Sequence, residues 1–209
     1  MHHWEENLCN KPGSRGIYND GGCAAYGSAK NAKLSPNDNV VIVGVGGLGL
    51  MAIQLAKAVT GAKIISMDLD DNKLKVAKEN GANSVVNSRK EDPVKTVMEL
   101  TDKTRPDAVI DFVNSSKTVE TDMNMLIRRR VRALPVGLFG GELKLNLVTF
   151  PTRAYRPIGS YIGTLNDFRD LVSLAKKVII KPVISNRYKQ MKLQKALQIL
   201  KDNKIIETV

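Results

Sequence analysis

The sequence predicts an α/β fold, a doubly wound parallel sheet of six strands with helices on both faces. From Asn39 onward, short apolar runs alternate with segments whose apolar residues keep helical spacing. The runs are apolar on both faces, as expected for strands buried between two layers of helices. A glycine-rich string at residues 44–49 separates the first run from the first helical segment. This alternation favours right-handed βαβ crossovers within one sheet.

The six strands are expected in the apolar runs at residues 40–44, 63–68, 84–87, 107–113, 132–138 and 158–162. Between them, helical spacing predicts helices over residues 48–59, 70–81, 91–100, 118–129 and 166–177. Gly61 is expected to end the first helix, and Asp70 and Asp71 can cap the second. Further on, residues 183–188 are strand-like, and residues 193–200 predict a last helix.

The first thirty-eight residues do not follow this alternation. Residues 10–22 are rich in turn formers, and no stretch of residues 1–38 is expected to build a core. We therefore expect three parts: an irregular, poorly structured segment over residues 1–38, the α/β domain over 39–183, and a helix/strand appendage over 184–209.

The glycine string Gly44-Val45-Gly46-Gly47-Leu48-Gly49 carries the main functional prediction. A G-x-G-x-x-G string between a strand and a helix, with an acid after the second strand, is typical of a dinucleotide-binding βαβ unit, the Rossmann fold. The glycines would let the backbone approach a pyrophosphate, which the N-terminus of the helix would hold. Asp68 would accept hydrogen bonds from ribose hydroxyls and repel a 2′-phosphate, so NAD is favoured over NADP. The alternative is a glycine-rich turn that binds no ligand.

Composition and charge limit the other classes of function. The longest apolar stretch, residues 40–53, has 14 residues and four glycines, too few to span a membrane. The first residues contain no apolar signal core, so a cytoplasmic protein without a membrane partner is expected. Cys9 and Cys23 cannot build a disulfide framework. The formal net charge of +11 could mark a nucleic-acid surface, with Arg128 to Arg132 the densest basic run. A solvated, lysine-rich surface is the favoured interpretation, with no specific nucleic-acid partner.

With these motifs, the chain resembles the zinc-containing, NAD-dependent medium-chain alcohol dehydrogenases from about residue 35 to residue 204. The resemblance rests on the glycine string with its helix, on Asp68 and Lys73, and on the later stretches 107–112, 136–141 and 159–163. It implies an acid–lysine pair, Asp68 and Lys73, at the ribose. It also implies that residues after the later strands line the coenzyme. These are Phe112, Val113 and Asn114 on the adenosine side, and Val136, Gly137, Leu138, Ser160 and Tyr161 on the nicotinamide side. Plain core packing is the alternative for each apolar one.

The same resemblance implies two zinc sites that this chain does not retain. Cys9 matches the last of four structural zinc cysteines, and Cys23 is either the remnant of a catalytic ligand or an accident of sequence. His2 and His3 have no recognised ligand spacing with them. Residues 1–38 would then be the remnant of a catalytic domain. Residues 184–209 would be an appendage of that domain, and no catalytic or metal residue is expected.

Three hypotheses follow from these observations. The first is an NAD-binding domain of an alcohol-dehydrogenase-like oxidoreductase, inactive because the zinc ligands are missing. The second is an enzyme that is active only with a partner chain or as part of a longer protein. The third is a non-enzymatic basic protein that uses the Rossmann scaffold to bind nucleic acid. A homodimer paired through the exposed edge of the sheet is also expected.

Overall fold

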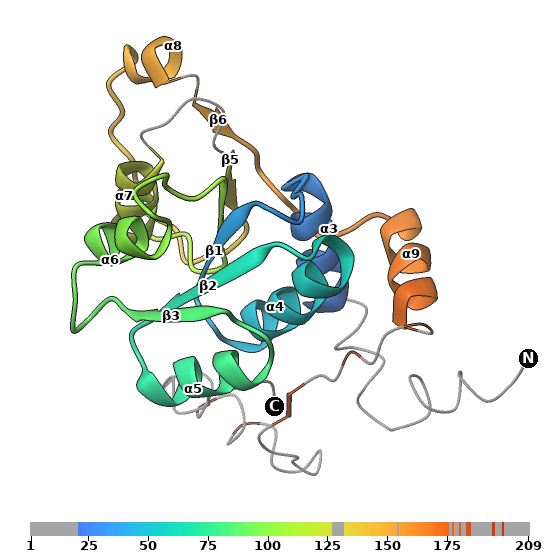
Figure 1. The fold of residues 1–209 in the computed structure, drawn as a ribbon. Helices are drawn as coiled ribbons and strands as arrows, with labels where there is room; N and C mark the ends of the chain where they lie inside the picture. Colours follow the sequence, from blue (N-terminus) through green and yellow to red (C-terminus); the bar gives the residue numbers. More distant parts are fainter. Residues whose placement is uncertain are drawn as a thin grey trace, which may run out of the picture.

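Among the residues that the structure describes, six parallel strands form one sheet, in the order β3-β2-β1-β4-β5-β6 (Figure 1). The structure is a computed structural model that describes residues 21–126, 132–153 and 155–175 and the single positions 177, 180, 183, 184, 194 and 198. The strands are β1 (Asn39–Val43), β2 (Lys63–Asp68), β3 (Ser84–Asn87), β4 (Ala108–Asp111), β5 (Arg132–Pro135) and β6 (Arg156–Pro157). The strand order reverses between β1 and β4, and this is where ligands of such sheets bind.

Helices cover both faces of this sheet. They are α3 (Cys23–Asn31), α4 (Gly47–Thr60), α5 (Asp71–Glu79), α6 (Pro93–Leu100), α7 (Ser116–Met125), α8 (Thr149–Arg153) and α9 (Leu165–Ala175). Four of them begin at side-chain caps: Asp70 accepts from an amide of α5, Asp92 from two amides of α6, Ser115 from one of α7, and Thr164 from one of α9. Among the described residues, no helix is long and apolar enough to cross a membrane.

The strands divide their side chains between two cores. Along β1, Val40 and Ile42 pack with α3 and α4, whereas Val41 and Val43 face the core that contains Val97 of α6 and Met125 of α7. This alternation follows from the two-residue period of a strand. Figure 1 shows α6 and α7 together on one side and α3 and α4 on the other. The predicted doubly wound parallel sheet is confirmed.

The expectation that residues 1–38 contain no core-forming stretch is wrong for residues 23–32. Helix α3 buries Ala25, Ala29 and Ala32 against the core below α4. Alanines four and three residues apart share one helix face, and their small side chains let two helices approach closely. The turn formers that precede residues 23–32 made this helical pattern difficult to recognise in the sequence. Residues 1–20 lie outside the described residues, and the three domain boundaries remain a prediction.

Several predicted element boundaries also differ from the structure. The sixth strand was expected at 158–162 but is Arg156–Pro157, although Ile158 N still donates to Ala133 O at 2.8 Å. Strand β5 ends at Pro135 instead of residue 138. Strand β4 ends at Asp111, whose carboxylate accepts hydrogen bonds from the amides of Val113 and Asn114. The short helix α8 was not predicted. The elements expected at 183–188 and 193–200 fall almost wholly outside the described residues.

Candidate functional site

The predicted glycine turn lies at the carboxyl end of β1, where the strand order reverses. Gly44 has φ +83°, and a Cβ there would lie 2.7 Å from Cγ2 of Val113. A Cβ on Gly49 would lie only 2.1 Å from the carbonyl oxygen of Gly44, so any side chain at residue 49 would break the contact between helix and turn. The first and last glycines are therefore required by the local backbone.

The middle glycine has a different environment. Gly46 is the N-cap of α4, makes no side-chain cap and has φ −81°, which any residue can adopt. A Cβ at Gly46 would meet no atom within 4 Å. Gly47 and Leu48 then begin the helix and are partly exposed to solvent. The first amides of a helix have no partner within the helix, and the helix dipole makes this end positive. The turn therefore combines open space with an environment suited to a diphosphate.

Asp68 closes the other side of this turn from the end of β2. Its Oδ2 accepts a hydrogen bond from Val45 N at 2.8 Å, and its Oδ1 accepts from Leu69 N at 2.7 Å and Asp70 N at 3.2 Å. A carboxylate has about four acceptor positions, so capacity remains for a ribose hydroxyl. Lys73 is half-buried and lies in the first turn of α5.

The loops after β4 and β5 are joined to each other. Asp111 accepts from Val113 N at 2.7 Å and Asn114 N at 2.9 Å, and Asn114 has φ +57°. The Asn114 amide nitrogen then donates to Gly137 O at 2.8 Å. This hydrogen bond holds the two loops together beside the glycine turn. The residues further along each loop are more exposed to solvent. Phe112 and Val136 are half-buried against the core, whereas Leu138 is 87% exposed.

Ser160 and Tyr161 follow the last strand and so also lie beyond a carboxyl strand end. Ser160 N donates to Pro135 O at 3.3 Å, which holds the segment beside β5. Ser160 is buried and its hydroxyl has no partner among the described residues, whereas Tyr161 is 78% exposed. Because all strands are parallel, every predicted coenzyme residue except Lys73 lies at or just beyond a carboxyl strand end. The two halves of the predicted site therefore both lie at the carboxyl ends of the strands.

The family profile described as zinc-binding dehydrogenase matches residues 47–177, from the start of α4 to just beyond α9. The chain belongs to the zinc-binding dehydrogenase family. This confirms the resemblance to the medium-chain alcohol dehydrogenases.

Members of the zinc-binding dehydrogenase family are similar to the chain in both sequence and structure. An NAD-dependent alcohol dehydrogenase of Sulfurisphaera tokodaii is 39% identical over 176 residues, which are 84% of this chain and 50% of that protein. One of Saccharolobus solfataricus is 34% identical over 186 residues, 88% of this chain and 53% of that protein. The alcohol dehydrogenase structure from Aeropyrum pernix has a TM-score of 0.84 and 35% identity, covering 91% of this chain and 55% of its own. The chain thus spans about half the length of these relatives.

The chain's own residues fit the dinucleotide that this family uses. A structure of acetophenone reductase from Geotrichum candidum in complex with NAD matches with a TM-score of 0.82 and 25% identity, over 96% of this chain and 56% of its own. In the present chain, the space above Gly46 is open, the N-terminus of α4 has no side-chain cap, and the Asp68 carboxylate stands beside both. The open space suits the diphosphate, the positive N-terminus of α4 suits the charge of the diphosphate, and the Asp68 carboxylate suits the hydroxyls of the adenosine ribose.

The described residues do not fit zinc. They contain no group of three or more His, Cys, Asp or Glu side chains arranged to hold a metal ion. Cys23, the candidate remnant ligand, is buried in α3 among the core residues. His2, His3 and Cys9 lie outside the described residues.

Sequence reasoning missed Asp111 and Thr118, which organise the site without being part of the predicted coenzyme contacts. Thr118 Oγ1 donates to Asp111 Oδ2 at 2.7 Å and also forms a capping box with Ser115. The signal was present: an acid ending an otherwise apolar strand is unusual, and Ser-x-x-Thr before a helix is a variant of the capping pattern.

Proposed function

We propose that this chain is the coenzyme-binding part of an alcohol-dehydrogenase-like oxidoreductase and that it binds NAD. The observation that carries the proposal is the Gly44–Gly49 turn with the Asp68 carboxylate hydrogen-bonded to its Val45 amide, at the point where the strand order reverses. NAD, when bound, accepts a hydride from the carbon of an alcohol. The residues of this chain bind and orient the coenzyme for that transfer.

Each part of the site has a separate role in this proposal. Amides of the glycine turn and the start of α4 hold the diphosphate, and Asp68 with Lys73 holds the adenosine ribose. Phe112, Val113 and Asn114 border the adenosine side. The residues of the nicotinamide side come from the two following loops, and they are Val136, Gly137, Leu138, Ser160 and Tyr161. The bond between Asn114 and Gly137 O keeps the two sides in register.

We further propose that this chain alone does not catalyse alcohol oxidation. The zinc ion of the family lowers the pKa of the alcohol and polarises the carbonyl product. The described part of the chain offers no cluster of ligands for such an ion. Activity that appears only when a second chain or a longer protein supplies zinc ligands would favour the second hypothesis.

Calorimetric titration with NAD tests the coenzyme proposal, and Gly46→Ala makes the test specific. A Cβ at Gly46 meets no protein atom, so the variant should fold normally while the new methyl group obstructs the diphosphate. We expect saturable binding to the unaltered chain and at least about tenfold weaker binding to Gly46→Ala, or about 1.4 kcal/mol.

Gly21→Ala is the matched control for this variant, because a Cβ at Gly21 also meets nothing within 4 Å. It should bind NAD like the unaltered chain. Equal affinities of Gly46→Ala and the unaltered chain would overturn the site, and an absence of NAD binding would overturn the proposed function.

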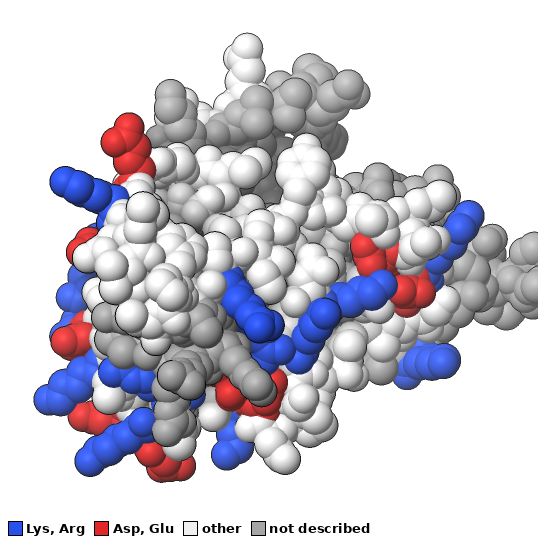
Figure 2. Space-filling model, turned by 90° about the horizontal axis from the view of Figure 1, so that it is seen from above, with Lys and Arg blue, Asp and Glu red and all other residues white. Residues whose placement is uncertain are grey.

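For partners, we propose a homodimer through the β6 edge of the sheet and no specific nucleic acid. Strand β6 is an edge strand, and the exposed apolar residues Leu147 and Val148 precede the helix that leads into it. On the face shown in Figure 2, basic and acidic side chains are interspersed, which argues against a continuous basic surface. Any binding of DNA should be weak and should fall steeply with added salt.

A further inference from the structure

Two buried carboxyl groups lie side by side where α7 meets the end of β4. Asp111 is the last residue of β4, and Asp122 lies in α7. They are 1% and 4% exposed. Asp122 stands four residues after Thr118, on the same face of α7, and Thr118 Oγ1 donates to Asp111 Oδ2 at 2.7 Å. The Asp122 carboxyl is also hydrogen-bonded to Asp111. Two side chains of one helix face therefore attach α7 to the end of β4.

A hydrogen bond between two carboxyl groups requires that one of them keeps its hydrogen. Asp111 accepts from Val113 N at 2.7 Å, from Asn114 N at 2.9 Å and from Thr118 Oγ1, so both of its oxygens act as acceptors. Burial raises the pKa of Asp122 well above the ordinary value, and the charge of Asp111 and the hydrogen bond to it raise that pKa further. The shared hydrogen therefore belongs to Asp122, whose O–H donates to the Asp111 carboxylate.

The amides that Asp111 holds belong to the loop on the adenosine side of the proposed coenzyme site. Asn114 has φ +57°, and its side-chain nitrogen donates to Gly137 O on the nicotinamide side at 2.8 Å. Both sides of the proposed site thus depend on how Asp111 is oriented. A carboxylate has about four acceptor positions, and Val113 N, Asn114 N, Thr118 Oγ1 and the Asp122 hydrogen are four donors. Asp122 completes this set of donors from inside the fold.

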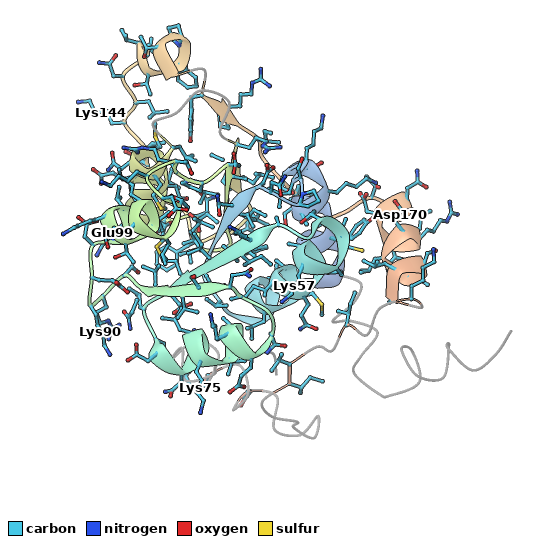
Figure 3. All side chains as sticks on the ribbon, in the orientation of Figure 1. Lys57, Lys75, Lys90, Glu99, Lys144 and Asp170 are labelled. Carbon is cyan, nitrogen blue, oxygen red and sulfur yellow. The ribbon has the colours of Figure 1, made fainter. Side chains whose placement is uncertain are left out.

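The other ionisable groups around α7 provide no cation for Asp122 within the described residues. Arg105 donates to the last carbonyls of α7, and Arg132 forms an ion pair at the opposite end of β5 from the proposed site. Burial, and then the charge that Asp122 carries once ionised, raise the pKa of the Tyr155 phenol. Exposed ionisable groups on α6, on α7 and in the loop after β5 are Lys95, Glu99, Lys117, Glu120 and Glu142. Glu99 lies on the outer side of α6 (Figure 3). Ionisation of Asp122 would therefore place two negative charges side by side.

We propose that Asp122 is a positioning residue of the coenzyme site, whose carboxyl hydrogen holds Asp111 and thereby keeps residues 112–114 in the shape that binds NAD. The inference rests on the proposed function, because NAD is the ligand whose binding it describes. Loss of the hydrogen leaves two carboxylates in contact, and their repulsion loosens the hold of Asp111 on the loop amides. NAD affinity should therefore fall as the pH rises and the hydrogen is lost.

Calorimetric titration of the full chain with NAD between pH 5 and pH 9 tests this role. The unaltered chain should lose at least about fivefold in affinity over this range. Asp122→Asn keeps the shape of the side chain and an N–H that can donate to Asp111 at every pH, so its affinity at pH 5 should match that of the unaltered chain and should not fall. Asp122→Ala removes the donor and should bind NAD at least about fivefold more weakly at pH 5. Circular dichroism checks that each variant is folded.

A second measurement does not require NAD. In the unaltered chain without coenzyme, the amide chemical shifts of Val113 and Asn114 should change over the same pH range, because Asp111 binds both amides. In Asp122→Asn these pH-dependent changes should disappear. A merely structural role for Asp122 would lower stability in Asp122→Ala and would leave both pH profiles as they are in the unaltered chain.

Two variants serve as controls. Glu120→Gln removes an exposed carboxylate from the same helix, and Tyr155→Phe removes the neighbouring phenol. Both should keep the pH profile of the unaltered chain. Parallel NAD profiles for Asp122→Asn and the unaltered chain, or undiminished affinity in Asp122→Ala, would overturn this inference alone. An unaltered chain that binds no NAD at any pH would overturn the proposed function, and the shifts of Val113 and Asn114 would then decide whether Asp122 holds this loop.

Discussion

At the level of single residues, three aspartates differ in their hydrogen-bond partners and therefore in their roles. Asp68 accepts from three backbone amides, and Asp111 accepts from two amides and one hydroxyl. These hydrogen bonds therefore hold both carboxylates in place. Asp122 is also buried, and burial together with the neighbouring Asp111 raises its pKa well above the ordinary value. Asp68 is thus suited to bind a coenzyme hydroxyl, Asp111 organises loops, and Asp122 packs beside Asp111 inside the fold.

Replacement of Asp68 tests the assignment of the ribose. Asp68→Ser removes the charge that would repel a 2′-phosphate and leaves a small hydroxyl that can still accept a hydrogen bond. We expect NAD to bind at least about tenfold more weakly, or about 1.4 kcal/mol, while NADP changes little or binds more tightly. Titration of the variant with both coenzymes measures the two changes. If both affinities fall equally, Asp68 supports the turn through Val45 without contacting the ribose.

Elements are held together by ion pairs as well as by apolar contacts. Lys30 of α3 lies 2.8 Å from Asp167 of α9 and 3.2 Å from Asp170. Asp167 Oδ2 also accepts from the Thr164 amide at 2.8 Å and the Thr164 hydroxyl at 2.7 Å, before the first turn of α9. The hydrogen bond from Lys30, followed by those from Thr164, lowers the pKa of Asp167 to about 2. The Asp167 carboxylate thus stabilises the N-terminus of α9 and also links α9 to α3 through an ion pair.

Acid should weaken this fastening in a defined pH range. Because the pKa of Asp167 is lower in the folded protein than in the unfolded chain, its contribution is complete above the ordinary aspartate value near 3.8 and is lost as the pH falls towards 2. We expect Asp167→Asn to lower the free energy of unfolding by about 1–2 kcal/mol at pH 6, since water screens the half-exposed Lys30 ammonium. Urea unfolding between pH 6 and 3 should show the difference shrinking.

Asp170→Asn is the control for this measurement, because both partners of the Lys30–Asp170 pair are about half exposed. Exposed pairs contribute at most about 1 kcal/mol. A loss for Asp167→Asn that stays constant down to pH 3 would show that the ion pair is not its cause.

Prediction from the sequence was most reliable for elements with strong local signals. The first two strands, the glycine turn and the cap at Asp70 each combine a period with a specific end residue, and the structure has them in place. The end of β4 was missed because a side chain sets it: the Asp111 carboxylate accepts hydrogen bonds from the amides of Val113 and Asn114. Helix α3 was missed because its face consists of alanines, whose hydropathy is weak and whose value depends on the helix they pack against.

At the scale of the whole molecule, the sheet has two edges and they differ. Strand β3 is one edge and β6 the other, and β6 has only two residues, one of which is Pro157. Proline cannot donate a hydrogen bond, so pairing at this edge must use the segment around it. Exposed apolar residues near β6, Leu147 and Val148, would add the buried area that a stable dimer needs.

Substitution at this edge tests the proposed homodimer. Val148→Asp should convert the dimer into a monomer, because a charge buried in an interface without a partner costs several kcal/mol. Sedimentation velocity over a range of concentrations measures the change. Val85→Asp, on the exposed face of the opposite edge strand β3, should remain dimeric. A monomeric unaltered chain would contradict the proposal, and loss of the dimer in Val85→Asp alone would assign it to β3.

Patterns in the sequence were enough to predict the fold class, the position of the glycine turn and the acid after β2, and thereby the family. These features are local: a strand period, a helix period and glycines required by the backbone can be recognised within about thirty residues. The folded structure was needed to show that Asp68 bonds to Val45, that Asn114 links two loops and that α3 enters the core. Such relations join residues distant in the chain, and only packing brings them within the few ångströms at which hydrogen bonds, burial and charge act.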